Sequence, residues 1–277
     1  MAYLANEFET LEPQYDVVVV GSGYGGSIAA SRMARARQRV CLFEKGLEYQ
    51  PGEYPDTELE ALAHMQMDSP DGHVGSANGL YEFHVNPEIN IFKGCGLGGT
   101  SLVNANVALR AEPRVYEDPN WPAAFRRDSA LMEKCYGWAE AMLKPTPYPD
   151  DQPELKKLSA LAESADGLGP FYRPPINVNF TEGVNHVGVT QHCCNGCGDC
   201  VSGCNFAAKN TLIMNYLPDA KNHGAHLFTG IDVRFIERVA DEWIVHFQRL
   251  DSGRQAFADI HGHDHAAKAQ TSYSSGH

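Results

Sequence analysis

The stretch Tyr15-Asp-Val-Val-Val-Val-Gly-Ser-Gly-Tyr-Gly-Gly26 decides the fold of this chain. Its unbroken apolar run is typical of a strand covered on both faces, and the run leads directly into glycines. Residues 27–37 are rich in Ala, Met and Arg and predict a helix, and residues 39–44 return to a strand pattern. This order predicts a βαβ unit, in which the two strands are parallel and the crossover is right-handed.

The glycines of this stretch have the spacing of a dinucleotide-binding turn. Gly21 allows a tight turn, Gly23 lets the backbone approach a pyrophosphate, and Gly26 lets the helix pack closely on the strand. The helix N-terminus then offers unpaired N–H groups and a positive dipole end to the phosphates. Glu44, at the end of the second strand, is placed to accept hydrogen bonds from ribose hydroxyls, which argues against a 2′-phosphate. The alternative is a simple packing turn with Glu44 as a solvated strand end.

Composition excludes several classes of protein. The chain has 277 residues, enough for one large or two modest domains, and 43% hydrophobic with 21% charged residues is typical of a soluble globular protein. The formal net charge of −13 repels nucleic acids and anionic lipid surfaces, so we expect no nucleic-acid partner. The aliphatic runs are too short for a membrane span, and the first 13 residues have no secretory pattern, so we expect a cytoplasmic protein.

A second glycine cluster follows at Asn90-Ile-Phe-Lys-Gly-Cys-Gly-Leu-Gly-Gly-Thr-Ser-Leu-Val-Asn-Ala-Asn106. Its backbone N–H groups, with the amides of Asn104 and Asn106, have the chemistry to line the second half of an extended cofactor. A flexible surface turn is the alternative interpretation, because loops of this composition are common.

The cysteines are concentrated in one place, since five of the eight lie between Cys193 and Cys204. Such crowding is typical of metal ligands and not of a disulfide scaffold. Cys194, Cys197, Cys200 and Cys204 reproduce the spacing of bacterial ferredoxins, whereas structural zinc prefers two well-separated pairs. Three interpretations stay open: an iron–sulfur cluster on these four residues, a loop of reduced cysteines, and a zinc site.

The rest of the chain gives weaker patterns. Residues 46–90 are irregular, with one short helix expected at 58–67, because prolines and glycines interrupt them. Helices are predicted at 122–143 and 152–165, and strands at 225–228, 231–239 and 243–249.

Three motifs together resemble the glucose–methanol–choline (GMC) family of FAD oxidoreductases, and most closely its bacterial cholesterol-oxidase-like branch. They are YDVVVVGSGYGGSIAASRMA with Glu44, GCGLGGTSLVNANV, and CGDCVSGCNFAAKNTL, in the expected order over residues 14–257. The resemblance implies an α/β fold, with a Rossmann-like FAD-binding domain (βαβ, GxGxxG) and part of an inserted α+β substrate domain.

The resemblance also implies a domain plan and a set of cofactor contacts. The plan assigns 14–120 to the first part of the FAD domain, 121–190 to the helical insertion of the substrate domain, and 191–257 to the cysteine loop and the return to the FAD-domain sheet. The implied FAD contacts are Gly21, Ser22, Gly23, Gly26, Glu44, Gly94, Gly98, Gly99, Thr100, Ser101 and Asn104.

The activity that the resemblance implies is oxidation of an alcohol, either sterol-like or otherwise bulky. A hydride passes from the C–OH carbon to the flavin, a histidine takes the hydroxyl proton, and oxygen or another acceptor removes the electrons. One alternative is a dehydrogenase with FAD and an iron–sulfur cluster that passes electrons to a quinone or cytochrome. Another is an FAD-binding fragment without activity.

The end of the chain departs from the family. The resemblance places the catalytic histidine, with its His or Asn partner, in the C-terminal half of a longer chain, so we expect an N-terminal portion without its base. His261, His263 and His265 match no family motif. We predict that residues 258–277 form a disordered, atypical tail.

Overall fold

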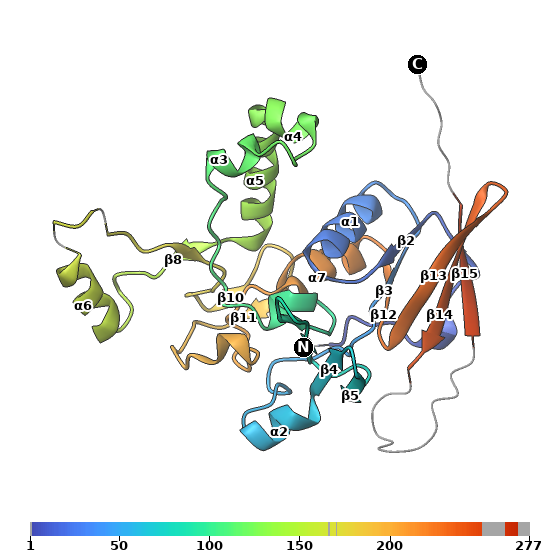
Figure 1. Cartoon of the computed structure of the whole chain (residues 1–277), viewed down its shortest axis with the longest axis horizontal. Helices are drawn as coiled ribbons and strands as arrows, with labels where there is room; N and C mark the ends of the chain where they lie inside the picture. The colour runs from blue at the N-terminus through green and yellow to red at the C-terminus, as the bar shows by residue number, and fades with distance from the viewer. Residues whose placement is uncertain (1, 166, 170, 251–263, 271–277) are drawn as a thin grey trace.

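The computed structural model describes residues 2–165, 167–169, 171–250 and 264–270 (Figure 1). At its centre is a parallel three-stranded sheet in the order β12-β3-β2. Its strands are β2 (Val17–Val20), β3 (Val40–Phe43) and β12 (His226–Phe228). Helix α1 (Tyr24–Arg35) connects β2 to β3, which confirms the predicted βαβ unit and the α/β fold.

Helices and a second sheet cover the two faces of this central sheet (Figure 1). On one face α1 packs against α7 (Tyr216–Asn222), which follows the short 3-10 helix η4 (Leu212–Met214). On the other face lies a mixed sheet in the order β1-β15-β14-β13. Its strands are β1 (Gln14–Tyr15), β13 (Ile231–Val239), β14 (Glu242–Arg249) and β15 (Asp264–Gln270). Phe43 and Phe247 meet between the two sheets with ring centroids 4.8 Å apart, so an aromatic core joins these layers.

Strand β15 corrects the prediction of disorder for residues 258–277. Residues 264–270 pair antiparallel with β14 and parallel with β1. Residues 264–270 have no alternation of apolar and polar side chains, so no local pattern predicts this strand. The strand forms through backbone N–H and C=O groups along the edge of β14. The remainder of the predicted tail, 258–263 and 271–277, lies outside the described residues.

A third sheet, in the order β5-β4-β6-β7, occupies the region expected to be irregular. Its strands are β4 (Met65–Ser69), β5 (Gly72–Gly75), β6 (Tyr81–His84) and β7 (Ile91–Gly94). The helix predicted at 58–67 is wrong in its second half: α2 (Glu58–Ala63) begins with a Thr57–Glu60 capping box and ends before β4. Strand β7 runs directly into the second glycine cluster, so this sheet sets where that cluster lies.

The segment between residues 113 and 176 extends away from these sheets (Figure 1). It contains α3 (Pro113–Glu117), α4 (Ala123–Arg127), α5 (Ser129–Leu143), α6 (Lys156–Ser164) and the strand pair β8 (Thr146–Pro147) and β9 (Pro175–Ile176). The helix predicted at 122–143 is divided, because the Asp128 side chain accepts a hydrogen bond from Leu131 N and starts α5 as its N-cap.

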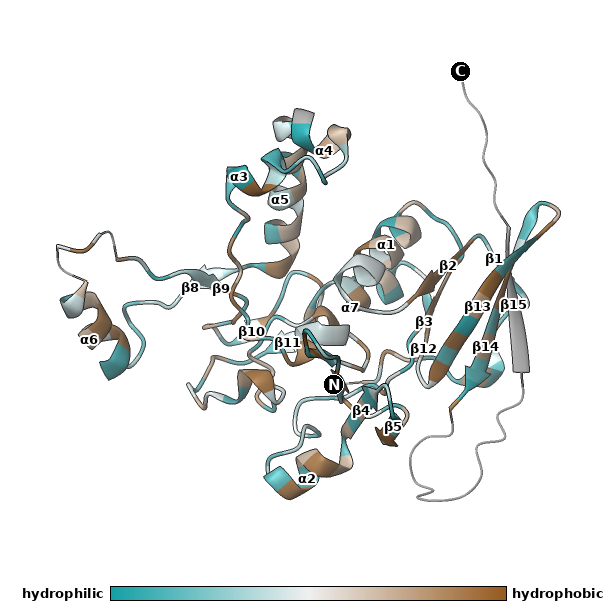
Figure 2. Cartoon of the chain, in the orientation of Figure 1, coloured by the Kyte–Doolittle hydropathy of each residue, from teal (hydrophilic) through white to brown (hydrophobic). Residues whose placement is uncertain are grey.

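Apolar residues occur along this extended segment (Figure 2), and the side chains of several of them are exposed. Helices α5 and α6 contain no buried residue, and Trp121, Phe125, Trp138 and Leu161 are exposed. A further hairpin, β10 (Gly183–Val184) with β11 (Thr190–Gln191), leads to the cysteine loop and its 3-10 helix η3 (Asp199–Val201). Within the described ranges, no helix has both the length and the apolar character needed to cross a membrane.

Candidate functional site

The glycine turn after β2 has the geometry that its sequence predicts. Gly21 has a φ of +84°, and a Cβ built on Gly26 would lie 1.9 Å from Gly21 O, so only glycine lets α1 approach the strand here. A Cβ built on Gly23 meets nothing within 4 Å, so the space in front of this residue is open. Helix α1 has no side-chain cap and no acidic residue in its first turn. Its N–H groups and positive dipole end therefore face an open space that suits an anion.

Glu44 lies against this turn, directly after β3. It is only 6% exposed, and its Oε2 accepts hydrogen bonds from Ser22 N at 2.9 Å and Ser22 Oγ at 2.5 Å. Its Oε1 accepts a hydrogen bond from Gly46 N at 2.9 Å. A carboxylate has about four acceptor positions, so Oε1 retains one position for a hydroxyl donor.

The second glycine cluster packs directly on the first, through 3-10 helix η2 (Gly99–Leu102) and the turn before it. A Cβ built on Gly99, whose φ is +55°, would lie 2.8 Å from the Gly23 Cα. Gly98 N donates a hydrogen bond of 2.8 Å to Ser22 Oγ. The structure therefore brings together the two loops that the sequence predicts to line one cofactor.

Other side chains of the second cluster hold the loop in place. Thr100 Oγ1 accepts a hydrogen bond from Gly94 N at 3.2 Å. The buried Ser101 hydroxyl donates to Gly98 O at 2.7 Å and accepts from Leu212 N at 3.1 Å. Both hydroxyls therefore stabilise the loop, and a cofactor contact of Ser101 stays a prediction.

Asn104 connects this cluster to the start of α1. Its Nδ2 donates a hydrogen bond of 3.0 Å to the hydroxyl of Tyr24, in the first turn of the helix. This hydrogen bond ties the Asn104 side chain to a residue of the first turn of α1. A cofactor contact of Asn104 stays a prediction.

The four cysteines singled out by spacing line one small cavity of about 20 Å³. They are free thiols, and no three of the described cysteine sulfurs all lie within 4.8 Å of one another. In a tetrahedral zinc site with Zn–S bonds of about 2.3 Å, the sulfurs lie closer together than 4.8 Å. The described cysteines therefore form no preformed zinc site. The iron–sulfur interpretation of Cys194, Cys197, Cys200 and Cys204 stays a prediction.

Lys209 is a buried cation that sequence reasoning missed. It is 2% exposed, and its Nζ donates hydrogen bonds to the backbone oxygens of Leu102 at 3.1 Å, Asn104 at 2.7 Å and Cys200 at 2.7 Å. Burial lowers the pKa of Lys209 to about 8, and the nearby thiols of Cys200 and Cys204 oppose this shift. The one signal in the sequence is its place in the third family motif, between Ala208 and Asn210.

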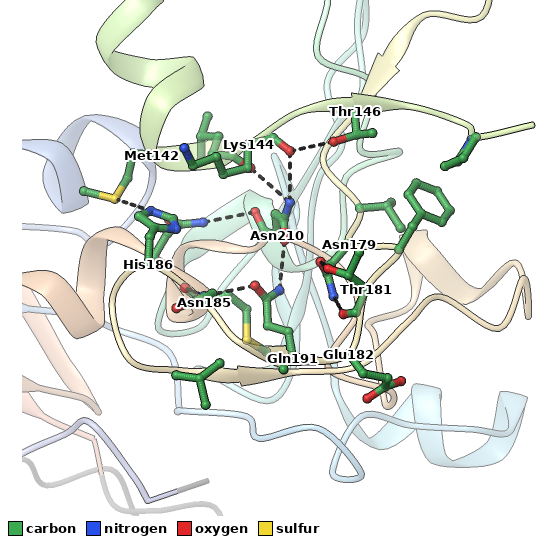
Figure 3. Close-up of a pocket in the computed structure, with 18 of the residues that line it drawn as sticks. Met142, Lys144, Thr146, Asn179, Thr181, Glu182, Asn185, His186, Gln191 and Asn210 are labelled. Carbon is green, nitrogen blue, oxygen red and sulfur yellow. Dashed lines mark hydrogen bonds between the residues drawn. The ribbon is translucent and has the colours of Figure 1, made fainter. Parts of the chain in front are cut away.

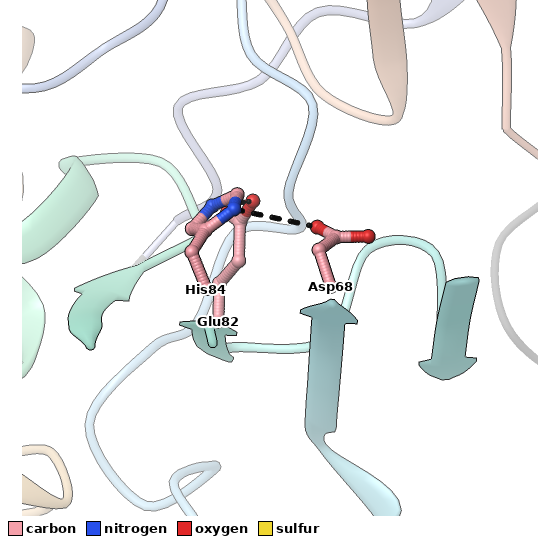
Figure 4. Close-up of side chains that lie close together, drawn as sticks. All are labelled: Asp68, Glu82 and His84. Atoms are coloured by element: carbon pink, nitrogen blue, oxygen red, sulfur yellow. Dashed lines mark hydrogen bonds and ion pairs between the residues drawn. The ribbon is translucent and has the colours of Figure 1, made fainter. Parts of the chain in front are cut away.

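Asp68, Glu82 and His84 lie close together on β4 and β6 (Figure 4). His84 Nε2 is 3.0 Å from Glu82 Oε1, and His84 Nδ1 is 3.7 Å from Asp68 Oδ2. Lys93 Nζ is 3.2 Å from the same Glu82 oxygen. This positive charge balances the carboxylate, which makes the cluster an ion-pair network across the third sheet.

A larger cavity of about 470 Å³ lies between the end of α5 and the β10–β11 hairpin (Figure 3). A chain of amides forms one wall: Asn185 Nδ2 donates to Gln191 Oε1, and Gln191 Nε2 donates to Asn210 Oδ1, each at 2.9 Å. Asn210 Nδ2 continues the chain to Leu143 O at 3.0 Å. These donors are used within the protein, so the amides fix the shape of the wall. No sequence motif predicted this cavity.

Comparison with known proteins agrees with the two-loop geometry. Residues 15–257 match the family model described as GMC oxidoreductase. The chain belongs to the GMC oxidoreductase family. GMC oxidoreductases bind FAD, and the resemblance drawn from the three sequence motifs is thereby confirmed.

This GMC chain has relatives among alcohol oxidases. It is 28% identical over 257 residues to a cholesterol oxidase of Mycobacterium tuberculosis, covering 87% of this chain and 43% of the relative. It is 28% identical over 242 residues to a long-chain-alcohol oxidase of Arabidopsis thaliana, covering 85% of this chain and 29% of the relative. It therefore spans less than half the length of these curated relatives.

A solved structure shows the same fold. The structure of a fungal aryl-alcohol oxidase superposes on the GMC chain with a TM-score of 0.52 at 16% sequence identity, covering 94% of this chain and 45% of that one.

Proposed function

We propose that the chain binds FAD across its two glycine loops. The proposed contacts are Gly21, Ser22, Gly23, Gly26, Glu44, Gly94, Gly98, Gly99, Thr100, Ser101 and Asn104. The observation that carries the proposal is the open space at Gly23, in front of an uncapped helix N-terminus and beside Gly99. A diphosphate suits this position, because the helix end supplies N–H donors and a positive dipole. Glu44 retains an acceptor position for a ribose hydroxyl.

The proposed reaction of the whole protein is oxidation of an alcohol. Bound FAD accepts the hydride from the alcohol carbon in such a reaction, and the two loops bind and orient it. The names of the relatives, cholesterol oxidase and long-chain-alcohol oxidase, favour a bulky apolar alcohol as substrate and oxygen as electron acceptor. In the alternative, the chain binds FAD without activity, and its flavin spectrum should not change when an alcohol is added.

Two successive measurements test binding and reaction separately. Titration of the purified chain into FAD, followed by flavin fluorescence and equilibrium dialysis, should show saturable binding with one FAD per chain. Cholesterol or a long-chain alcohol is then added without oxygen to the FAD-bound chain. Bleaching of the visible flavin bands supports the alcohol reaction, and an unchanged spectrum supports the portion without activity. Absence of saturable FAD binding contradicts the proposed cofactor site.

A second candidate function adds an iron–sulfur cluster to the flavin and electron export to a quinone or cytochrome. The observation that favours it is the single cavity shared by the four spaced cysteines. Analysis of iron and acid-labile sulfide after anaerobic purification tests it. Cys200→Ser should lose the iron while Cys135→Ser, an exposed cysteine on α5, should retain it. A preparation without iron removes this candidate.

A further inference from the structure

Lys209 joins two segments that are far apart in the sequence. Its Nζ has three N–H donors, and all three acceptors are backbone oxygens: two in the second glycine cluster and one in the cysteine loop. Burial of an ammonium group is costly, and an apolar side chain of similar length would fill the same space at lower cost. Lys209 therefore supplies three hydrogen bonds to the backbone that an apolar side chain of similar length, such as methionine, could not supply.

These hydrogen bonds fix the direction of the peptide groups around Asn104. The Asn104 carbonyl points to the Lys209 Nζ at 2.7 Å. No peptide bond in the described chain is cis, and in a planar trans peptide the N–H points opposite to the C=O. The N–H of Ala105 therefore points away from Lys209, and Ala105 is exposed. The same stretch carries the Asn104 side chain, which reaches the first turn of α1 through Tyr24.

We infer that Lys209 is a positioning residue for the FAD site: its ammonium group fixes the backbone of 102–106 so that Asn104 and the Ala105 N–H are presented on the side away from the lysine. This inference rests on the proposed FAD function, because Asn104 bonds Tyr24 at the start of the helix that follows the first glycine loop. It also predicts that the cysteine loop is part of the same support, since Cys200 O is the third acceptor.

The first test compares Lys209→Met with Lys221→Met. Lys221 is a matched control, because it is a partly buried lysine whose Nζ donates its hydrogen bond to Asn6 Oδ1 and not to a glycine loop. We expect FAD affinity to fall roughly tenfold or more in Lys209→Met, the size expected for lost hydrogen bonds to a charged group. Lys221→Met should keep the affinity of the unmodified chain. Thermal melts without FAD separate lost binding from lost folding, because a purely stabilising lysine would lower the melting temperature and leave the affinity of the folded fraction unchanged.

A second measurement needs no variant. Hydrogen exchange of the unmodified chain with and without FAD should show peptides covering 100–106 and 199–209 gaining protection together. Protection confined to 100–106 would overturn the inference, as would normal FAD affinity in folded Lys209→Met. Failure of the unmodified chain to bind FAD would overturn the proposed function itself, so the two failures are distinguishable.

Discussion

Gly99 lies so close to Gly23 that a Cβ built on Gly99 would stand 2.8 Å from the Gly23 Cα. The two residues come from loops separated in the chain by β3 and the β5-β4-β6-β7 sheet, and their contact leaves no room for a side chain on Gly99. Glycine is required at Gly99 for a second reason, because its φ of +55° is rarely adopted by residues with a Cβ.

Gly99→Ala should therefore separate the two loops. We expect a loss of about 1–3 kcal/mol in the free energy of unfolding, from backbone strain and overpacking, together with weaker FAD binding. Gly137→Ala is the control, because Gly137 lies within α5 with nothing near its built Cβ and should be neutral or slightly stabilised. Urea unfolding of both variants checks this. Equal stability of Gly99→Ala and the unmodified chain would refute the loop contact.

Ser22 is the polar counterpart of this contact. Its buried hydroxyl donates to Glu44 and accepts from Gly98 N, so Ser22→Ala leaves the Gly98 N–H without this acceptor. The expected cost is about 1–3 kcal/mol of stability. Ser164→Ala, which removes an exposed hydroxyl at the end of α6, should change stability little. If chemical denaturation shows equal costs for the two serines, the bridging role of Ser22 is wrong.

Asp219 should make the chain sensitive to acid. Burial of this carboxyl opposes ionisation, but hydrogen bonds from Arg35 and Ser31 outweigh it and lower the pKa of Asp219. A lowered pKa in the folded state means that the stabilisation is present above the usual value of about 4 and is lost as the pH falls through the folded-state pKa. Thermal melts between pH 7 and pH 3 should therefore show a steeper loss of stability for the unmodified chain than for Asp219→Asn.

The amount of stabilisation at neutral pH can be measured with the same variant. The Asp219 side chain is 4% exposed and that of Arg35 is 47% exposed, so solvent screens part of the pair and we expect Asp219→Asn to cost about 1–2 kcal/mol. Asp16→Asn breaks the more exposed pair with Arg39 and should cost less. A larger loss of stability in Asp16→Asn than in Asp219→Asn would contradict the role assigned to the Arg35–Asp219 ion pair between α1 and α7.

The sequence predicted the parts of the fold that local patterns encode. The apolar run 17–20, the three glycines and the strand at 40–43 form one contiguous unit, so each local choice agrees with the tertiary structure. The β5-β4-β6-β7 sheet was missed because its strands are short and their stability comes from pairing with distant partners. Met65 and Met67, for example, closely follow the residues of α2 in the sequence yet pair with Tyr81 and Phe83 on β6.

The candidate site shows the same limit. Glycine spacing and Glu44 predicted the first loop, and the resemblance to the GMC family predicted the second. The spacing within one motif contains no information about which residues of the two loops touch. Lys209 was missed for a related reason. A lysine that follows two alanines is expected at the surface, and only the packed structure shows that three backbone carbonyls accept its hydrogen bonds.

The FAD affinity of Gly23→Ala tests the central claim most directly. Gly23 has an ordinary φ of −62° and open space where a Cβ would stand, so alanine should leave the melting temperature of the FAD-free chain unchanged. If the diphosphate of FAD occupies that space, the added methyl group should weaken binding roughly tenfold or more. Gly25→Ala, two residues further on in α1 and with equally open space at its built Cβ, should bind like the unmodified chain. Gly23→Ala with normal stability and undiminished FAD affinity would contradict the account.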